Sequence, residues 1–213
     1  MKRSRNSAQI HHSAKICASA VIGKQFRPAL AGSPSYKVSQ KAIIEERVYV
    51  GEYATIGAGS VVGKGAIIDD FSIVECEVEI GKRTLLIYRA HVCNGAFVGH
   101  DCVVGGFIGE NTVVGNYCRI FGTIAHAQYN PLLKWDGKHS EEKAPTFDDL
   151  SFVGFGAVVA GGVHIGYKAY IMAGTIVTKD VPSFHIVSGV NRMVHYSNWR
   201  GTLSQSPFFL EGK

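Results

Sequence analysis

Aliphatic side chains recur along this chain at every sixth position. From Val38 to Val104 the spacing is unbroken over twelve positions, each occupied by Val, Ile or Leu. These positions are Val38, Ile44, Val50, Ile56, Val62, Ile68, Val74, Ile80, Leu86, Val92, Val98 and Val104. Shorter runs in shifted register flank them, namely Ile10, Ile16 and Ile22 before, and Ile108, Val114, Ile120, Val153, Val159, Ile165, Ile171 and Val177 after. A period of six therefore extends over most of the chain.

Small residues form a second column, because Ala, Ser, Thr or Cys usually stands four positions after each aliphatic residue. Cys102 and Cys118 fall in this column, so we predict that they line an interior wall. Glycine often follows the aliphatic residue directly, as at Gly57 and Gly81. Such glycines mark places where the backbone bends or where a side chain would be penalised.

A six-residue unit is too short to contain a helix, but it fits one short strand and a corner. Three units close a triangular coil of about 18 residues, in which every sixth side chain points inward. Successive coils then stack about 4.8 Å apart by parallel strand pairing. The 23 matched positions, three to a coil, predict between seven and eight coils. The expected fold is all-β, a parallel β-helix of hexapeptide repeats.

Three interruptions break the period. Residues about 25–37 are predicted to form a surface loop near the base of the helix. At Gly106 the repeat is shortened by two residues. The non-periodic segment 127–148 is predicted to be a long mid-chain loop, and loops of that length inside a compact repeat are usually functional.

The repeat, with its aliphatic residue, frequent glycine and small residue, resembles that of the hexapeptide-repeat acyltransferases. Thr178 to Pro182, with the sequence TKDVP, resembles the closing motif of that family, although Asn191 and Arg192 depart from its usual ending. The resemblance covers Ile10 to about Gly201 and is closest to the N-acetyltransferases of nucleotide-linked amino sugars. It implies a left-handed helix over residues 1–200, with 201–213 as a short C-terminal cap or tail.

Composition adds few constraints. The 22 basic and 17 acidic residues give a net charge of +5, which suits a phosphate-bearing ligand but equally an ordinary soluble surface. The chain has no apolar signal core and no run of 18 apolar residues, so we expect a cytoplasmic protein that binds neither membrane nor nucleic acid. Five cysteines without a CxxC pair predict neither a disulfide framework nor a zinc ribbon.

Histidine suits the task of accepting a proton from an acyl acceptor. His100 lies in VGHDCVVG, which resembles the His-Asp-Cys string of family members in which the histidine is the general base and the acid, here Asp101, orients it. Its place two residues after Val98 predicts an outward-facing corner. His126 is the alternative base, because it stands six residues after Ile120 and opens the long loop. An exposed corner residue and a loop histidine bonded to backbone remain the alternatives.

If the shortening at Gly106 lies in a corner, Val114 stacks over Val98 and the neighbours of the two catalytic candidates follow. We then expect Lys82 below His100 and Asn116 above it, and Asp101 between Arg83 and Tyr117. Lys82 and Arg83 are candidates for binding a substrate phosphate. The remaining candidates for substrate contact are Asn116, Tyr117, His91 and Asn94.

The resemblance implies acetyl-CoA as co-substrate, bound along the outside of the later coils. The matching positions are Gly156, Ala173 and Gly174 for close backbone approach, with Lys179 and Arg192 for phosphate. No metal is expected.

The predicted function is acetyl transfer from acetyl-CoA to the amine of a nucleotide-linked amino sugar. The alternatives are O-acetylation of a sugar, serine or antibiotic, a zinc protein like the γ-class carbonic anhydrases, and a non-catalytic scaffold. The chain lacks the five-residue histidine step of those anhydrases. We expect a homotrimer with sites between subunits, because one prism offers only flat faces and corners. The long loop is expected to reach across the groove between subunits.

Overall fold

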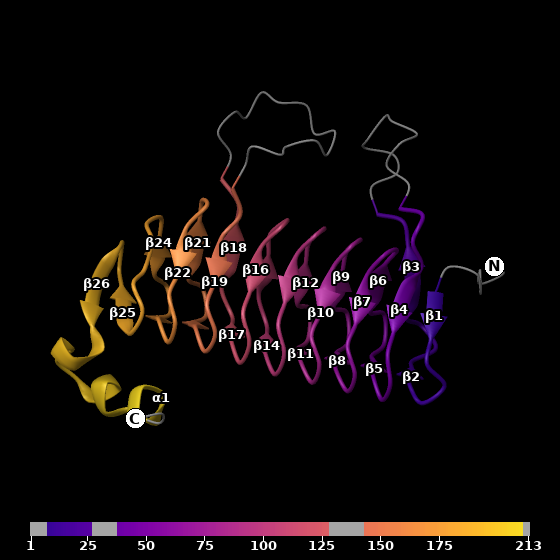
Figure 1. The fold of residues 1–213 in the computed structure, drawn as a ribbon, viewed down its shortest axis with the longest axis horizontal. Coiled ribbons are helices and arrows are strands. Elements are labelled where there is room, and N and C mark those ends of the chain that lie inside the picture. The colour runs from indigo at the N-terminus through magenta and orange to yellow at the C-terminus, as the bar shows by residue number, and fades with distance from the viewer. Residues whose placement is uncertain (1–7, 27–37, 128–142, 211–213) are drawn as a thin grey trace.

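The computed structural model describes residues 8–26, 38–127 and 143–210, and these form a parallel β-helix with three sheets (Figure 1). Sheet A consists of β1 (Ala8–Ile10), β4 (Ala42–Ile44), β7 (Val61–Val62), β10 (Glu79–Ile80), β13 (Phe97–Val98), β16 (Val113–Val114), β19 (Thr146–Phe147) and β22 (His164–Ile165). Sheet C consists of β3 (Val21–Lys24), β6 (Thr55–Gly57), β9 (Ile73–Val74), β12 (His91–Val92), β15 (Phe107–Ile108), β18 (Thr123–Ala125), β21 (Val158–Ala160) and β24 (Ile176–Val177).

Sheet B is the longest of the three. It consists of β2 (Lys15–Ile16), β5 (Tyr49–Val50), β8 (Ile67–Ile68), β11 (Leu85–Leu86), β14 (Val103–Val104), β17 (Arg119–Ile120), β20 (Phe152–Val153), β23 (Tyr170–Ile171), β25 (His185–Ser188) and β26 (Arg192–His195). Its last pair is antiparallel, whereas the other strand pairs of the described chain are parallel. The helices η1 (Tyr196–Asn198), η2 (Thr202–Gln205) and α1 (Pro207–Leu210) follow. None of the described helices has the length and apolar character needed to cross a bilayer.

Inward aliphatic side chains fill the interior, as the six-residue period predicted. Ile44 and Val104 are almost completely buried, as are the period positions between them. Each such side chain contributes roughly 1.5–3 kcal/mol by leaving water. The small-residue column is also confirmed, since Cys102 and Cys118 are 1% and 0% exposed. Eight strands in sheets A and C of the described chain agree with the expected number of coils.

Two positions of the expected inward column were assigned wrongly. Val38 is not buried and precedes the first strand after the gap, where Gln25 makes two hydrogen bonds with its backbone. Phe147 is an inward residue of β19, paired with Val114 and 3% exposed, so the helix resumes before Asp148. An aromatic residue in an aliphatic column hid this strand. Residues 27–37 and 128–142 of the two predicted loops lie outside the described part of the chain.

The corners between the sheets are called here edge AB, edge BC and edge CA, in chain order. Edge BC is shortened twice, at Gly105–Gly106 and at Phe121–Gly122, where two residues replace the usual four. Strand pairing across these coils therefore steps by 16 residues, as in Val98 with Val114. Gly106 packs so closely on the Gly122 carbonyl that a Cβ there would overlap it. The sequence predicted the first shortening and missed the second.

Candidate functional site

His100 lies on edge AB, where backbone and side-chain hydrogen bonds fix it between two coils. The Lys82 backbone N–H donates to His100 Nδ1 at 3.0 Å, and the His100 N–H donates to Asn116 Oδ1 at 2.9 Å. Val98 pairs with Val114, so the predicted neighbours below and above His100 are confirmed. The residue is exposed, as expected for a corner.

The bond to Lys82 determines which ring nitrogen of His100 carries the proton. A backbone N–H can only donate, so Nδ1 must accept. The neutral ring then carries its proton on Nε2. In this arrangement His100 offers a hydrogen-bond donor to a ligand, and it would act as a base at Nε2 only after losing the bond to Lys82.

Asp101 is bound to Arg83 rather than to the imidazole. The guanidinium donates from Nε and Nη2 to the two carboxylate oxygens at 2.7 and 2.6 Å. These hydrogen bonds lower the pKa of the Asp101 carboxyl. Asp101 thus lies beside Arg83 as predicted, but in the described structure Lys82, not Asp101, orients the His100 ring.

Other polar residues of edge AB complete this group. Asn116 also contacts Asp149, which accepts from its backbone N–H at 2.6 Å. The Tyr117 N–H donates to the His100 carbonyl at 2.8 Å, and its side chain is 51% exposed. Tyr117 therefore presents its phenol to solvent one coil above His100. Asp149 was not recognised from the sequence, because the intervening 127–148 segment conceals the repeat register.

His126 lies on edge CA, directly after β18. The second shortening of edge BC makes Ile124 the inward residue, so the expectation that His126 occupies an inward position is wrong. His126 Nδ1 lies 3.1 Å from the Ala127 carbonyl oxygen. A carbonyl can only accept, so Nδ1 carries the proton and Nε2 holds the lone pair of the neutral ring. This is the form in which a histidine can accept a proton.

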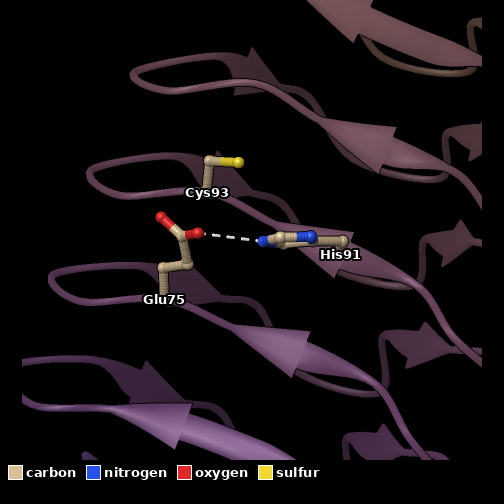
Figure 2. Close-up of side chains that lie close together, drawn as sticks. All are labelled: Glu75, His91 and Cys93. Carbon is tan, nitrogen blue, oxygen red and sulfur yellow. Dashed lines mark hydrogen bonds and ion pairs between the residues drawn. The ribbon is translucent and has the colours of Figure 1, made fainter. Parts of the chain in front are cut away.

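A second histidine on edge CA is paired with a buried carboxylate (Figure 2). His91 Nε2 lies 3.0 Å from Glu75 Oε1, and the Asn94 N–H donates to Glu75 Oε2 at 3.3 Å. Glu75 and Cys93 are 3% and 2% exposed. The nitrogen, oxygen and sulfur atoms of His91, Glu75 and Cys93 lie within 4.8 Å of one another.

Sequence reasoning named His91 and Asn94 but missed Glu75 and Cys93. A signal for them exists, because both directly follow an inward valine, where glycine is common, and they are one 18-residue coil apart. A carboxylate and a thiol in that position depart from the repeat in the same way.

The residues expected to bind acetyl-CoA fall into two groups. Gly156 and Gly174 lie on edge BC of successive coils with φ near +68°, and Gly174 N–H donates to the Phe155 carbonyl at 3.0 Å. Ala173 beside them is exposed. Lys179 and Arg192 are exposed and adjoin a hydrogen-bonded pair, in which the Thr178 N–H donates to Asn191 Oδ1 at 2.9 Å.

The predicted site residues are thus distributed over three edges of one prism. Edge AB carries Lys82, Arg83, His100, Asp101, Asn116 and Tyr117; edge CA carries His91, Asn94 and His126; edge BC carries Gly156, Ala173 and Gly174. The two histidines proposed as bases therefore do not meet within one chain.

Comparison with known proteins gives partial matches. The chain is 36% identical over 107 residues to a serine acetyltransferase from Synechococcus elongatus, covering 50% of this chain and 40% of that protein. It is 32% identical over 161 residues to the bifunctional protein GlmU of Thermotoga maritima, covering 75% of this chain and 30% of that protein. The chain thus spans less than half the length of both relatives. No protein-family model matches the sequence.

Among solved structures, a UDP-N-acetylglucosamine acyltransferase resembles this chain with a TM-score of 0.57 at 18% identity. The likeness covers 88% of this chain and 71% of that one. It shows the fold, a left-handed parallel β-helix, and confirms the fold class expected from the repeat.

Proposed function

Because the chain belongs to the hexapeptide-repeat acyltransferase family, we propose that it is a CoA-dependent acyltransferase. Its acceptor is the amine of a nucleotide-linked amino sugar, and acetyl-CoA is the donor. The resemblance to acetyltransferases in sequence and the polar groups on edges AB and CA support this proposal.

Acyl transfer needs a base for the acceptor and a donor for the oxyanion that develops on the thioester carbonyl. His126 is assigned the first role, because its Nδ1–H points to the Ala127 carbonyl and leaves a lone pair on Nε2. His100 is assigned the second, because its bond from Lys82 places the proton on Nε2. The opposite hydrogen-bond polarity of these two rings is the observation that carries the mechanism.

The two histidines lie on different edges, so the proposal requires two subunits. In a homotrimer, edge AB of one subunit faces edge CA of the next, and the site forms between them. His100 then comes from one protomer and His126 from its partner. A groove between two prisms also provides the enclosed volume that a small-molecule site needs.

The remaining polar residues are assigned to the two substrates. Lys82 is the candidate for the acceptor phosphates, because Arg83 is already paired with Asp101. Tyr117 contacts the sugar, with Asn116 and Asn94 as further hydrogen-bonding groups. Acetyl-CoA lies along Gly156, Ala173 and Gly174, with its phosphates near Lys179 and Arg192.

Mixing two inactive variants tests the shared site. His100→Ala and His126→Ala subunits, unfolded and refolded together in equal amounts, should recover about one quarter of the wild-type sites, since one site in four combines an intact His100 with an intact His126. Each variant refolded alone is the control. If the mixture is no more active than the mean of its parents, both histidines act within one subunit or only one of them acts.

Serine is the second candidate acceptor, because the serine acetyltransferase of Synechococcus elongatus is 36% identical over the matched region. A thioester-release assay with a panel of nucleotide amino sugars, serine, simple sugars and aminoglycosides distinguishes the two. Preferred turnover of a nucleotide amino sugar supports the proposal. Preferred turnover of serine replaces N-acylation by O-acylation at the same site.

A further inference from the structure

Three metal-ligating side chains converge on edge CA, apart from the pair of histidines assigned above. Glu75 follows β9, His91 lies in β12 and Cys93 follows β12 one coil above Glu75. Figure 2 shows the three side chains reaching into the same space from successive coils. We propose that Glu75, His91 and Cys93 bind a divalent transition-metal ion, with zinc as the expected occupant.

The donor set selects the class of metal. A thiolate, an imidazole and a carboxylate together favour zinc over calcium or magnesium, which prefer oxygen ligands only. Three protein ligands also leave the fourth tetrahedral position for water or another small ligand. The site would therefore be an open one rather than a closed structural centre.

The distances are close to those of a bound ion. In tetrahedral zinc sites, neighbouring donor atoms lie roughly 3.3–3.8 Å apart, given bonds of about 2.0–2.3 Å. Glu75 Oε1 and His91 Nε2 are already 3.0 Å apart, and all three donor atoms lie within 4.8 Å of one another. Rotation of side chains by about 1 Å closes the remaining gap, and the backbone need not move.

Burial and charge support the same occupant. The Glu75 side chain is 4% exposed, and an ionised carboxylate removed from water is costly unless a cation or several donors offset it. The Asn94 N–H, at 3.3 Å, supplies one donor that would hold the carboxylate in place. The His91 side chain is 31% exposed, so an ion could enter from its side. Binding replaces the thiol proton of Cys93 by the metal and releases that proton to solvent.

Cobalt(II) is the probe for this site, because a thiolate bound to it gives a ligand-to-metal charge-transfer absorption band. The full-length protein, stripped with a chelator, should bind one Co²⁺ per chain and develop this band, and Zn²⁺ should displace the cobalt. Cys93→Ser should abolish the band, while His91→Gln and Glu75→Gln should each weaken Co²⁺ affinity at least tenfold.

Cys76→Ser is the matched control, since this cysteine is also 2% exposed and adjoins Glu75, but its Sγ points to the Lys24 carbonyl. It should keep the band and the stoichiometry. Absence of stoichiometric Co²⁺ and Zn²⁺ binding by the wild type overturns the proposal, as does an unchanged band in Cys93→Ser. Neither result depends on acyl transfer, so the proposed enzyme activity stands or falls separately.

Discussion

Edges AB and CA each hold a histidine bonded through Nδ1 to the backbone, yet the two rings are prepared for opposite tasks. On edge AB a backbone N–H points at His100 Nδ1. On edge CA a backbone C=O lies next to His126 Nδ1. The first ring therefore exposes N–H at Nε2, and the second holds its lone pair there.

This difference shows that the partner of the inner ring nitrogen decides the role of a surface histidine. Both residues are histidines at corners of the same repeat, and neither differs in a way that composition reveals. The His-Asp-Cys string favours His100 as the base, whereas the hydrogen bonds favour His126. Tests of the comparison should therefore separate a proton acceptor from a proton donor.

Replacing His126 should have the largest effect. His126→Ala should lower kcat by about 10² to 10⁴-fold, the usual size for loss of a general base. The acidic limb of the kcat/KM profile should disappear with it, as measured by thioester release between pH 5.5 and 9. His185→Ala is the control, because His185 also bonds a backbone carbonyl through Nδ1, at 2.9 Å from Ser183. A variant with more than a third of the wild-type rate would remove His126 from the mechanism.

Replacing His100 should have a smaller effect and a different signature. His100→Ala should lower kcat by about 10² to 10³-fold, as expected for loss of one oxyanion donor. His100→Gln should recover part of the rate, because an amide N–H can donate but cannot serve as a base. The pH profile should keep its acidic limb in both variants. Loss of the limb in His100→Ala, without rescue by glutamine, would instead identify His100 as the base.

Replacing Asp101 should have the smallest effect, because its partner is Arg83 rather than His100. Asp101→Asn should change kcat by less than about threefold, since an exposed ion pair contributes little. Arg83 lowers the pKa of the Asp101 carboxyl. The pair therefore stabilises the fold above the unfolded pKa of about 3.9 and loses this contribution as the pH falls through the lower folded value.

Thermal unfolding measures this last difference. At pH 6, Asp101→Asn should have a slightly lower Tm than the wild type, and the two curves should converge well below pH 4. A large loss of kcat in Asp101→Asn, with normal unfolding, would mean that the carboxylate turns to the imidazole during catalysis.

The period of six was sufficient to predict the fold, because burial of one aliphatic residue per unit leaves a direct mark on the sequence. It also gave the neighbours of His100, since the register of Val98 and Val114 follows from counting. Counting failed where a coil is short or an aromatic residue points inward. The missed shortening at Phe121–Gly122 displaced His126, and Phe147 hid a strand.

The roles of side chains could not be obtained by counting. The bond from Lys82 to His100 depends on the rotamer of a ring at a corner, and periodicity carries no information about it. The convergence of Glu75, His91 and Cys93 likewise requires side chains of two coils to turn toward one another. Their spacing places them on neighbouring coils but does not set their directions.

The double shortening of edge BC limits how this solenoid could be rebuilt. Coils of equal circumference are exchangeable modules, which can be removed, duplicated or grafted in steps of 18 residues. Between Gly105 and Gly122 the circumference is 16 residues, and the contact of Gly106 with the Gly122 carbonyl leaves no space for a Cβ. Splicing in steps of 18 is therefore open to the coils below this zone, whereas a cut within it would have to carry both tight corners together.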